Sequence, residues 1–158
     1  MFSKIFMEKQ KNSAKYYMKK AIEEAYIARA KGELPVGAII VCKKKIIARA
    51  HNLVETLNDA TAHAEMLAMS SAFIHLGSRY LGDCTLYSTL EPCFMCGAAT
   101  QWAQMGGIVY GAADKQRGAH SLAAKMILHP RTNITTSVCS EQCQDLIKNF
   151  WSEVRNFF

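Results

Sequence analysis

The sequence has no apolar run long enough to cross a membrane or to form the core of a signal peptide. At its start, in residues 1–9, charged residues alternate with short apolar steps. It also has no linker, internal repeat or low-complexity tract, and half of its 158 residues are hydrophobic. A chain of this size can bury one good core. We therefore expect a cytoplasmic protein with no membrane contact, formed by a single domain over 1–158 whose core covers about 15–150.

Acidic residues are scarcer than basic ones, thirteen against nineteen, and the imbalance lies in the first part of the chain. Residues 1–50 carry twelve basic and four acidic residues, a net charge of +8, whereas the remainder carries seven and nine, or −2. A basic half favours a polyanion such as RNA as a partner, because phosphate contacts supply most non-specific affinity for nucleic acids. A solvated lysine-rich surface is the alternative, and Lys43, Lys44 and Lys45 also suit a hairpin turn.

The hydrophobic periodicity changes between helical and strand spacing along the chain. The expected elements are a helix over 13–31, hairpin strands over 36–42 and 46–50, a helix over 61–76 capped by Thr61, a strand over 85–90, a helix over 92–104 opened by Pro92, a strand over 107–111, a helix over 121–129, a strand over 134–139 and a last helix capped by Ser140. Strands that alternate with helices predict an α/β fold, a three-layer α/β/α sandwich on a five-stranded mixed sheet.

Two short motifs carry the chemistry. His63 and Glu65 lie in one, and Cys93 and Cys96 lie one helical turn apart in the other. Six cysteines without a secretory segment favour metal binding by the close pair over a disulfide. Three zinc-type ligands with a separate carboxylate are typical of a catalytic zinc site, which keeps its fourth position for water. A zinc site that only stabilises the fold is the alternative.

The order and spacing of several motifs resemble one family over about 17–150. These motifs are Pro35-Val36-Gly37-Ala38, His51-Asn52, Asp59-Ala60-Thr61-Ala62-His63-Ala64-Glu65, Thr89-Leu90-Glu91-Pro92-Cys93-Phe94-Met95-Cys96, Tyr110-Gly111-Ala112-Ala113-Asp114 and His129-Pro130. Together they closely resemble the bacterial tRNA adenosine deaminases of the cytidine and deoxycytidylate deaminase superfamily. The resemblance implies the cytidine-deaminase-like fold and hydrolytic conversion of adenosine to inosine at the wobble position of a tRNA anticodon stem-loop. It also implies a homodimer with one Zn2+ per subunit.

The resemblance assigns roles to individual residues. His63, Cys93 and Cys96 would hold the zinc, and Glu65 would move the protons. The remaining candidates contact substrate: Asn52 would hold the base, Val36 and Leu90 would form the pocket wall and its closing loop, and Asp114 with Lys115 would meet the RNA. A turn or capping role for Asn52 is the alternative. Trp102 and Met105 belong either to the dimer interface or to the core.

Three positions depart from the family pattern. Ala113 stands where an arginine is common, His120 where a small glycine is common, and the aromatic pair Phe150-Trp151 is not followed by several arginines. These departures affect the expected RNA contacts and leave the zinc chemistry unchanged. Two other functions stay open: a deaminase of free guanine, cytosine or a nucleoside, and a non-catalytic RNA-binding protein stabilised by zinc. Nothing in the chain names the tRNA isoacceptor.

Overall fold

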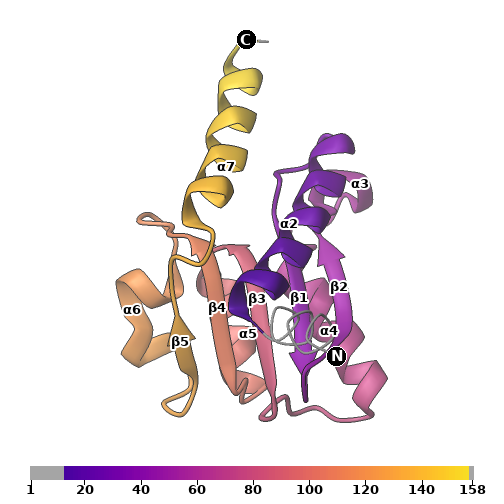
Figure 1. Cartoon of the computed structure of the whole chain (residues 1–158), viewed down its shortest axis with the longest axis vertical. Coiled ribbons are helices and arrows are strands. Elements are labelled where there is room, and N and C mark those ends of the chain that lie inside the picture. The colour runs from indigo at the N-terminus through magenta and orange to yellow at the C-terminus, as the bar shows by residue number, and fades with distance from the viewer. Residues whose placement is uncertain (1–12, 157–158) are drawn as a thin grey trace, which may run out of the picture.

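The computed structural model describes residues 13–156, which form a five-stranded mixed sheet in the order β2-β1-β3-β4-β5 (Figure 1). The strands are β1 (Gly37–Cys42), β2 (Lys45–His51), β3 (Cys84–Leu90), β4 (Gly107–Ala112) and β5 (Asn133–Thr135). β1 pairs antiparallel with β2 and β3, and β4 pairs parallel with β3 and β5. The predicted mixed sheet is confirmed. As a result, β2, β3 and β4 finish, and β1 begins, at the same end of the sheet.

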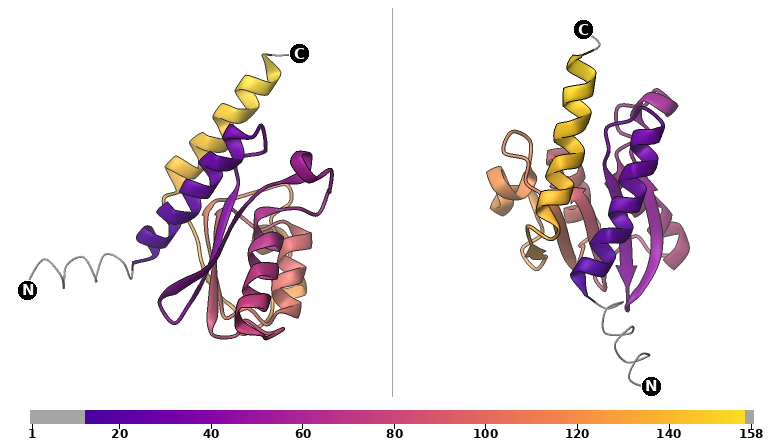
Figure 2. Two further views of the ribbon diagram at one scale, coloured as in Figure 1. Left: turned by 90° about the vertical axis from the view of Figure 1, so that its right-hand side faces the viewer. Right: turned by 45° about the horizontal axis from the view of Figure 1, so that its top comes forward.

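Helices cover both faces of the sheet, so the predicted three-layer sandwich is also confirmed (Figure 2). One face packs against α2 (Ala14–Ala30) and α7 (Ser140–Arg155), through side chains such as Met18, Ile22 and Leu146. The other packs against α4 (Ala64–Leu76), α5 (Phe94–Trp102) and α6 (Ala119–Ile127). Between residues 13 and 156, no helix combines the length and the apolar character needed to span a bilayer.

Two helices begin later than the sequence predicts. Thr61 does not cap α4: its hydroxyl and N–H donate to the carboxylate of Asp59, and His63 occupies the N-cap position. Likewise α5 begins at Phe94 with Cys93 as its N-cap, not at Pro92. Neither N-cap side chain makes a capping hydrogen bond. The ordinary capping signals misplace these helix starts because candidate metal ligands occupy the N-cap positions.

The last third differs in detail from the predicted elements. The strand predicted over 134–139 extends only over Asn133–Thr135, since Ser137 and Cys139 adopt positive φ and turn the chain away. Cys139, not Ser140, is the N-cap of α7. The predicted helix over 121–129 begins at Ala119 and is kinked at Ala123. A four-residue helix, α3 (Val54–Leu57), was not predicted.

Candidate functional site

A pocket of about 700 Å3 lies at the end of the sheet where β2, β3 and β4 finish. It is lined by seven of the nine predicted site residues, namely Val36, Asn52, His63, Glu65, Leu90, Cys93 and Asp114. Cys96 is buried beside His63. Lys115 is exposed and does not line the pocket, whereas Arg117, two residues further on, does.

The three predicted metal ligands lie together. The ligand atoms of His63, Cys93 and Cys96 are all within 4.8 Å of one another, and they are the only such His, Cys, Asp or Glu group between residues 13 and 156. Nδ1 of His63 lies 3.7 Å from Sγ of Cys93 and 3.5 Å from Sγ of Cys96. One imidazole and two thiols are donors that zinc prefers. His63 and Cys93 are N-caps, so the positive ends of two helix dipoles face the cluster and favour anionic ligands.

The charges of the cluster also suit a cation. The pKa of Cys93 is lowered to about 4, chiefly by its hydrogen bond with Cys96 and then by the one with His63. The pKa of Cys96 is raised, because it shares that hydrogen bond with ionised Cys93 and is buried. The protein's own groups therefore stabilise one thiolate of the pair. A divalent cation would supply the charge that the second thiolate needs.

Glu65 lies beside this cluster and is not part of it. The second residue of α4, it is buried in the pocket wall, where the Ser88 hydroxyl donates to Oε1 over 3.4 Å. Burial raises the pKa of Glu65 to about 7, and the negative charge of Cys93 contributes to the rise. A carboxyl group that titrates near neutrality can both accept and donate a proton. The site therefore contains three side chains that could hold a metal ion and a separate carboxyl group that can exchange a proton near neutral pH.

Asn52 follows β2 and is buried against the start of α4. Its Oδ1 accepts a hydrogen bond of 2.9 Å from the Ala64 N–H, so the side chain caps the helix that carries His63 and Glu65. The capping role considered from the sequence is therefore present. Because the amide has separate accepting and donating ends, this bond uses the oxygen and leaves the Nδ2 amino group for a ligand.

The sequence left the role of Glu91 uncertain, and the structure shows what this residue contacts. It is 1% exposed, and its carboxylate accepts hydrogen bonds from the Asp114 N–H and from both the N–H and the hydroxyl of Ser121. A Cβ at Gly118 would lie 2.2 Å from Cδ of Glu91, so only glycine fits at position 118. Glu91 thus holds the segment just before Cys93 against the 114–121 loop, which forms one side of the mouth of the pocket and is called its rim below.

Glu33 plays the equivalent part on the opposite side of the pocket. It is 1% exposed and accepts hydrogen bonds from the N–H groups of Glu55 and Thr56 and from the Thr56 hydroxyl, which holds α3 in place. Burial tends to raise its pKa, but these hydrogen bonds outweigh that effect and lower it. Both glutamates bind groups more than twenty residues away, so no local pattern could have identified them.

We expect Glu91→Gln to lower the free energy of unfolding by about 1–3 kcal/mol, because the amide NH2 would face a buried donor that it cannot accept from. Zinc content should stay at the wild-type level, since Glu91 is not a member of the metal cluster. Urea denaturation measures the loss. Ser121→Ala, which removes only the hydroxyl, is the matched control and should cost less. Equal stability of Glu91→Gln and the wild type would contradict this account of the rim.

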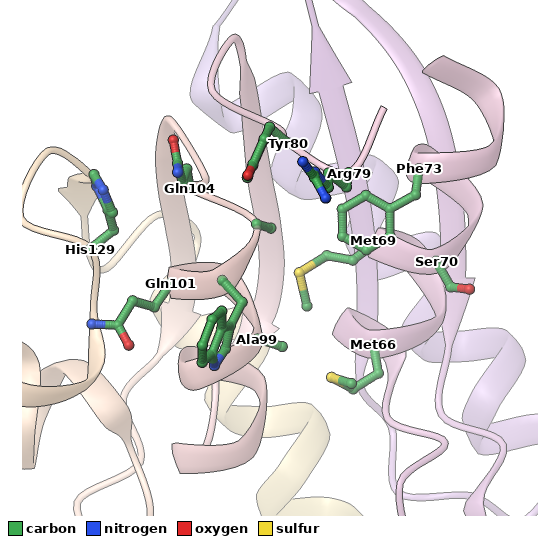
Figure 3. A pocket seen from close by; sticks show the side chains of 12 residues that line it. Met66, Met69, Ser70, Phe73, Arg79, Tyr80, Ala99, Gln101, Gln104 and His129 are labelled. Carbon is green, nitrogen blue, oxygen red and sulfur yellow. The ribbon is translucent and has the colours of Figure 1, made fainter. Parts of the chain in front are cut away.

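A second hollow, of about 920 Å3, lies between α4 and α5 on the outer face of the molecule (Figure 3). Met66, Met69 and Phe73 contribute its apolar wall from α4, and Tyr80 stands at its edge. Trp102 at the end of α5 also lines it and is 83% exposed. No member of the metal cluster and no buried acid lines this groove, so it is not the chemical site. We call it the α4–α5 groove.

Comparison with known proteins gives one family model and several relatives that match this chain. Residues 11–112 match the family model described as the cytidine and deoxycytidylate deaminase zinc-binding region. The chain is 41% identical to the tRNA-specific adenosine deaminase of Aquifex aeolicus, over 89% of this chain and 95% of the relative. It is also 41% identical to that of Bacillus subtilis, over 88% and 89%.

A solved structure gives the same result. It comes from a study of A-to-I editing by tRNA:A34 deaminases at the wobble position of transfer RNA. It matches this fold with a TM-score of 0.78 and 33% identity, covering 83% of this chain and 98% of the other.

Proposed function

Because the chain belongs to the zinc-binding cytidine and deoxycytidylate deaminase family, and within it to the tRNA-specific adenosine deaminases, we propose that it deaminates adenosine to inosine at the wobble position of a tRNA anticodon. The observation that carries this proposal is the buried carboxyl of Glu65 beside, but outside, a cluster of three metal-binding side chains. The reaction consumes one water and releases one ammonia. We also propose that it takes place in the cytoplasm, where transfer RNA is used.

His63, Cys93 and Cys96 would hold one zinc ion per subunit. When bound, zinc lowers the pKa of a coordinated water by several units and so makes a nucleophile available near neutral pH. Glu65 takes one proton of the attacking water and passes it to a ring nitrogen of the base; it then takes the second proton from the same oxygen and gives it to the departing amine, which leaves as ammonia. One carboxyl group can perform these transfers because they follow one another, and its raised pKa suits a group that alternates between two protonation states.

The pocket walls would hold the base. Val36 is buried directly before β1 and Leu90 is half-buried at the end of β3, so both offer apolar surface to a purine ring. The Nδ2 group of Asn52 can donate a hydrogen bond to a base acceptor while its oxygen stays bound to α4. A flipped nucleotide is read in this manner, by apolar contact and by hydrogen bonds to its edge.

Residues at the mouth of the pocket would meet the neighbouring nucleotides. Phe150 and Trp151 of α7 line the mouth, where bases of a single-stranded loop can stack on aromatic rings. The Asp114 carboxylate, which also lines the pocket, accepts from the N–H groups of Gln116 and Arg117 and so shapes the turn that carries Arg117. We propose phosphate contacts for Arg117 and for the exposed Lys115.

Two of the departures from the family pattern have partners inside the protein. His120 Nδ1 lies 2.9 Å from the hydroxyl of Tyr110. Glu153, which stands among the positions where arginines are common, forms an ion pair with Arg29 and so links α7 to α2. Both residues therefore make contacts within the protein, and neither contact closes the pocket.

The test uses zinc-loaded protein with an anticodon stem-loop that carries a wobble adenosine, and separately with free bases and nucleosides. We expect inosine from the stem-loop alone, together with ammonia. Ammonia from guanine, cytosine or a nucleoside with an untouched stem-loop would replace the proposal with a small-molecule deaminase. Bound zinc without product from any substrate would leave a non-catalytic zinc protein.

We propose that the α4–α5 groove is the contact surface of a homodimer. Apolar patches of this kind on a protein surface usually mark an interaction site. Here a methionine-lined hollow lies next to the exposed ring of Trp102, so two copies related by a two-fold axis could each bury the other's tryptophan. Met105, by contrast, is buried in the core. Of the two roles considered from the sequence, the core role therefore applies to Met105.

We expect Trp102→Asp to convert the dimer to a monomer, because the substitution would place a charge at the centre of an apolar interface. Sedimentation velocity over a range of concentrations measures this change. Ile74→Asp is the matched control, since Ile74 is 82% exposed on α4 and does not line the groove. A dimer that survives Trp102→Asp would exclude this surface.

A further inference from the structure

The hairpin between β1 and β2 turns through two lysines in an unfavourable backbone conformation. Cys42 pairs with Lys45, so the connection has two residues, and Lys43 and Lys44 have φ of 47° and 65°. Positive φ at both central positions defines the type I′ turn, for which asparagine followed by glycine is the favoured pair. Lysine rarely adopts this conformation, because its Cβ crowds the backbone. A residue kept in such a conformation points to a role beyond the turn itself.

Three further lysines lie in the segments next to this turn, in β2 and at the start of α2. Lys45 follows the turn directly, and Lys15 and Lys19 lie on the first turns of α2. The Tyr17 hydroxyl donates a 3.0 Å hydrogen bond to the carbonyl of Lys44, which fixes the turn against α2. All five lysines are exposed, and none of them forms an ion pair with any residue from 13 to 156. We call Lys15, Lys19, Lys43, Lys44 and Lys45 the hairpin lysine patch.

The patch lies far from the pocket, at the other end of the sheet. In Figure 1 the turn is at the lower end of β1 and β2, whereas β2 finishes next to α3 at the upper end. α2 runs between the two ends, and its 17 residues span about 25 Å. An RNA whose loop enters the pocket would therefore meet these lysines only with a part outside that loop.

On the basis of the proposed function, we propose that the hairpin lysine patch binds the phosphate backbone of the RNA substrate outside the anticodon loop. Five exposed ammonium groups at this end of the sheet, none of them ion-paired within residues 13–156, give the positive field that attracts a polyanion and releases its counterions. A turn required only to be polar would be satisfied by asparagine and glycine. The unfavourable turn conformation of Lys43 and Lys44 distinguishes this patch from an ordinary solvated surface.

The test replaces the turn by its favoured pair, in the variant Lys43→Asn/Lys44→Gly. The variant should melt at a higher temperature than the wild type, since the new residues suit the turn. Its Kd for full-length tRNA should nevertheless rise about tenfold at moderate salt, and the slope of log K against log salt should decrease by about 2. Its Kd for a minimal hairpin, the same loop on the shortest stem that folds, should equal that of the wild type.

Lys125→Gln/Arg131→Gln is the charge-matched control, since it removes the same charge beyond β4 and should leave both Kd values unchanged. An unchanged Kd for full-length tRNA in a turn variant of raised melting temperature would overturn the proposal, and so would an equal loss of affinity for the minimal hairpin. The wild-type rate of inosine formation from the stem-loop is measured separately. Its absence would contradict the proposed function, whereas the comparison of Kd values tests the patch independently of turnover.

Discussion

Glu65→Gln is expected to bind zinc as well as the wild type and to form inosine about 10⁴-fold more slowly. Glutamine has nearly the same shape as glutamate but cannot take a proton from water or give one to the leaving amine. Both transfers that we assign to Glu65 would then lack their acid/base group, while His63, Cys93 and Cys96 stay in place. Zinc analysis and single-turnover inosine formation on the stem-loop measure the two effects.

Ser88→Ala is the control for this substitution. It removes the hydroxyl that donates to Glu65 over 3.4 Å and leaves the carboxyl itself intact. Because that hydrogen bond is long, we expect a loss of no more than about tenfold. A Glu65→Gln enzyme with activity within tenfold of the wild type would remove Glu65 as the proton carrier.

Cys96→Ser is expected to lose zinc and to lower the melting temperature, with loss of activity as a result. Cys96 is fully buried, and a serine hydroxyl is a poor zinc ligand compared with a thiolate. Metal that binds only the folded state stabilises that state, so its loss appears as lost stability. Melting temperatures measured with added zinc and with a chelator should differ for the wild type and coincide for the variant.

Cys84→Ser provides the comparison, because Cys84 is equally buried in β3 but lies outside the metal cluster. It should keep its zinc and its response to the chelator, even if it is less stable. Wild-type zinc content in Cys96→Ser would show that the ligand set is wrong.

The sequence predicted the sheet and the layers well, because strands and helices differ in hydrophobic period and the period reports which side of each element is buried. It misplaced the starts of α4 and α5. Thr61 and Pro92 are good helix-start residues, but the chain places His63 and Cys93 at the N-cap positions instead. The packing of these two segments at the pocket therefore overrides the local capping preference.

The site was predicted unevenly for a similar reason. The three candidate metal ligands and Glu65 lie in two compact motifs, whose residue types and resemblance to a known family make them easy to propose from the sequence. Glu33 and Glu91 act on N–H groups that lie 22 to 30 residues away in sequence. Such contacts depend on how the elements pack, and no periodicity or capping pattern marks them.

These two carboxylates affect how the entropy cost of binding would be divided between the protein and the RNA. Glu33 and Glu91 already fix α3 and the 114–121 loop on opposite sides of the pocket. Little ordering of these segments is then left for the moment of association, so the rim is preorganised. The unfavourable entropy of binding would then fall mainly on the nucleic acid, which would have to unstack and extrude one nucleotide. A loop whose bases are already splayed apart loses least, so a rigid rim selects among RNAs by their own flexibility.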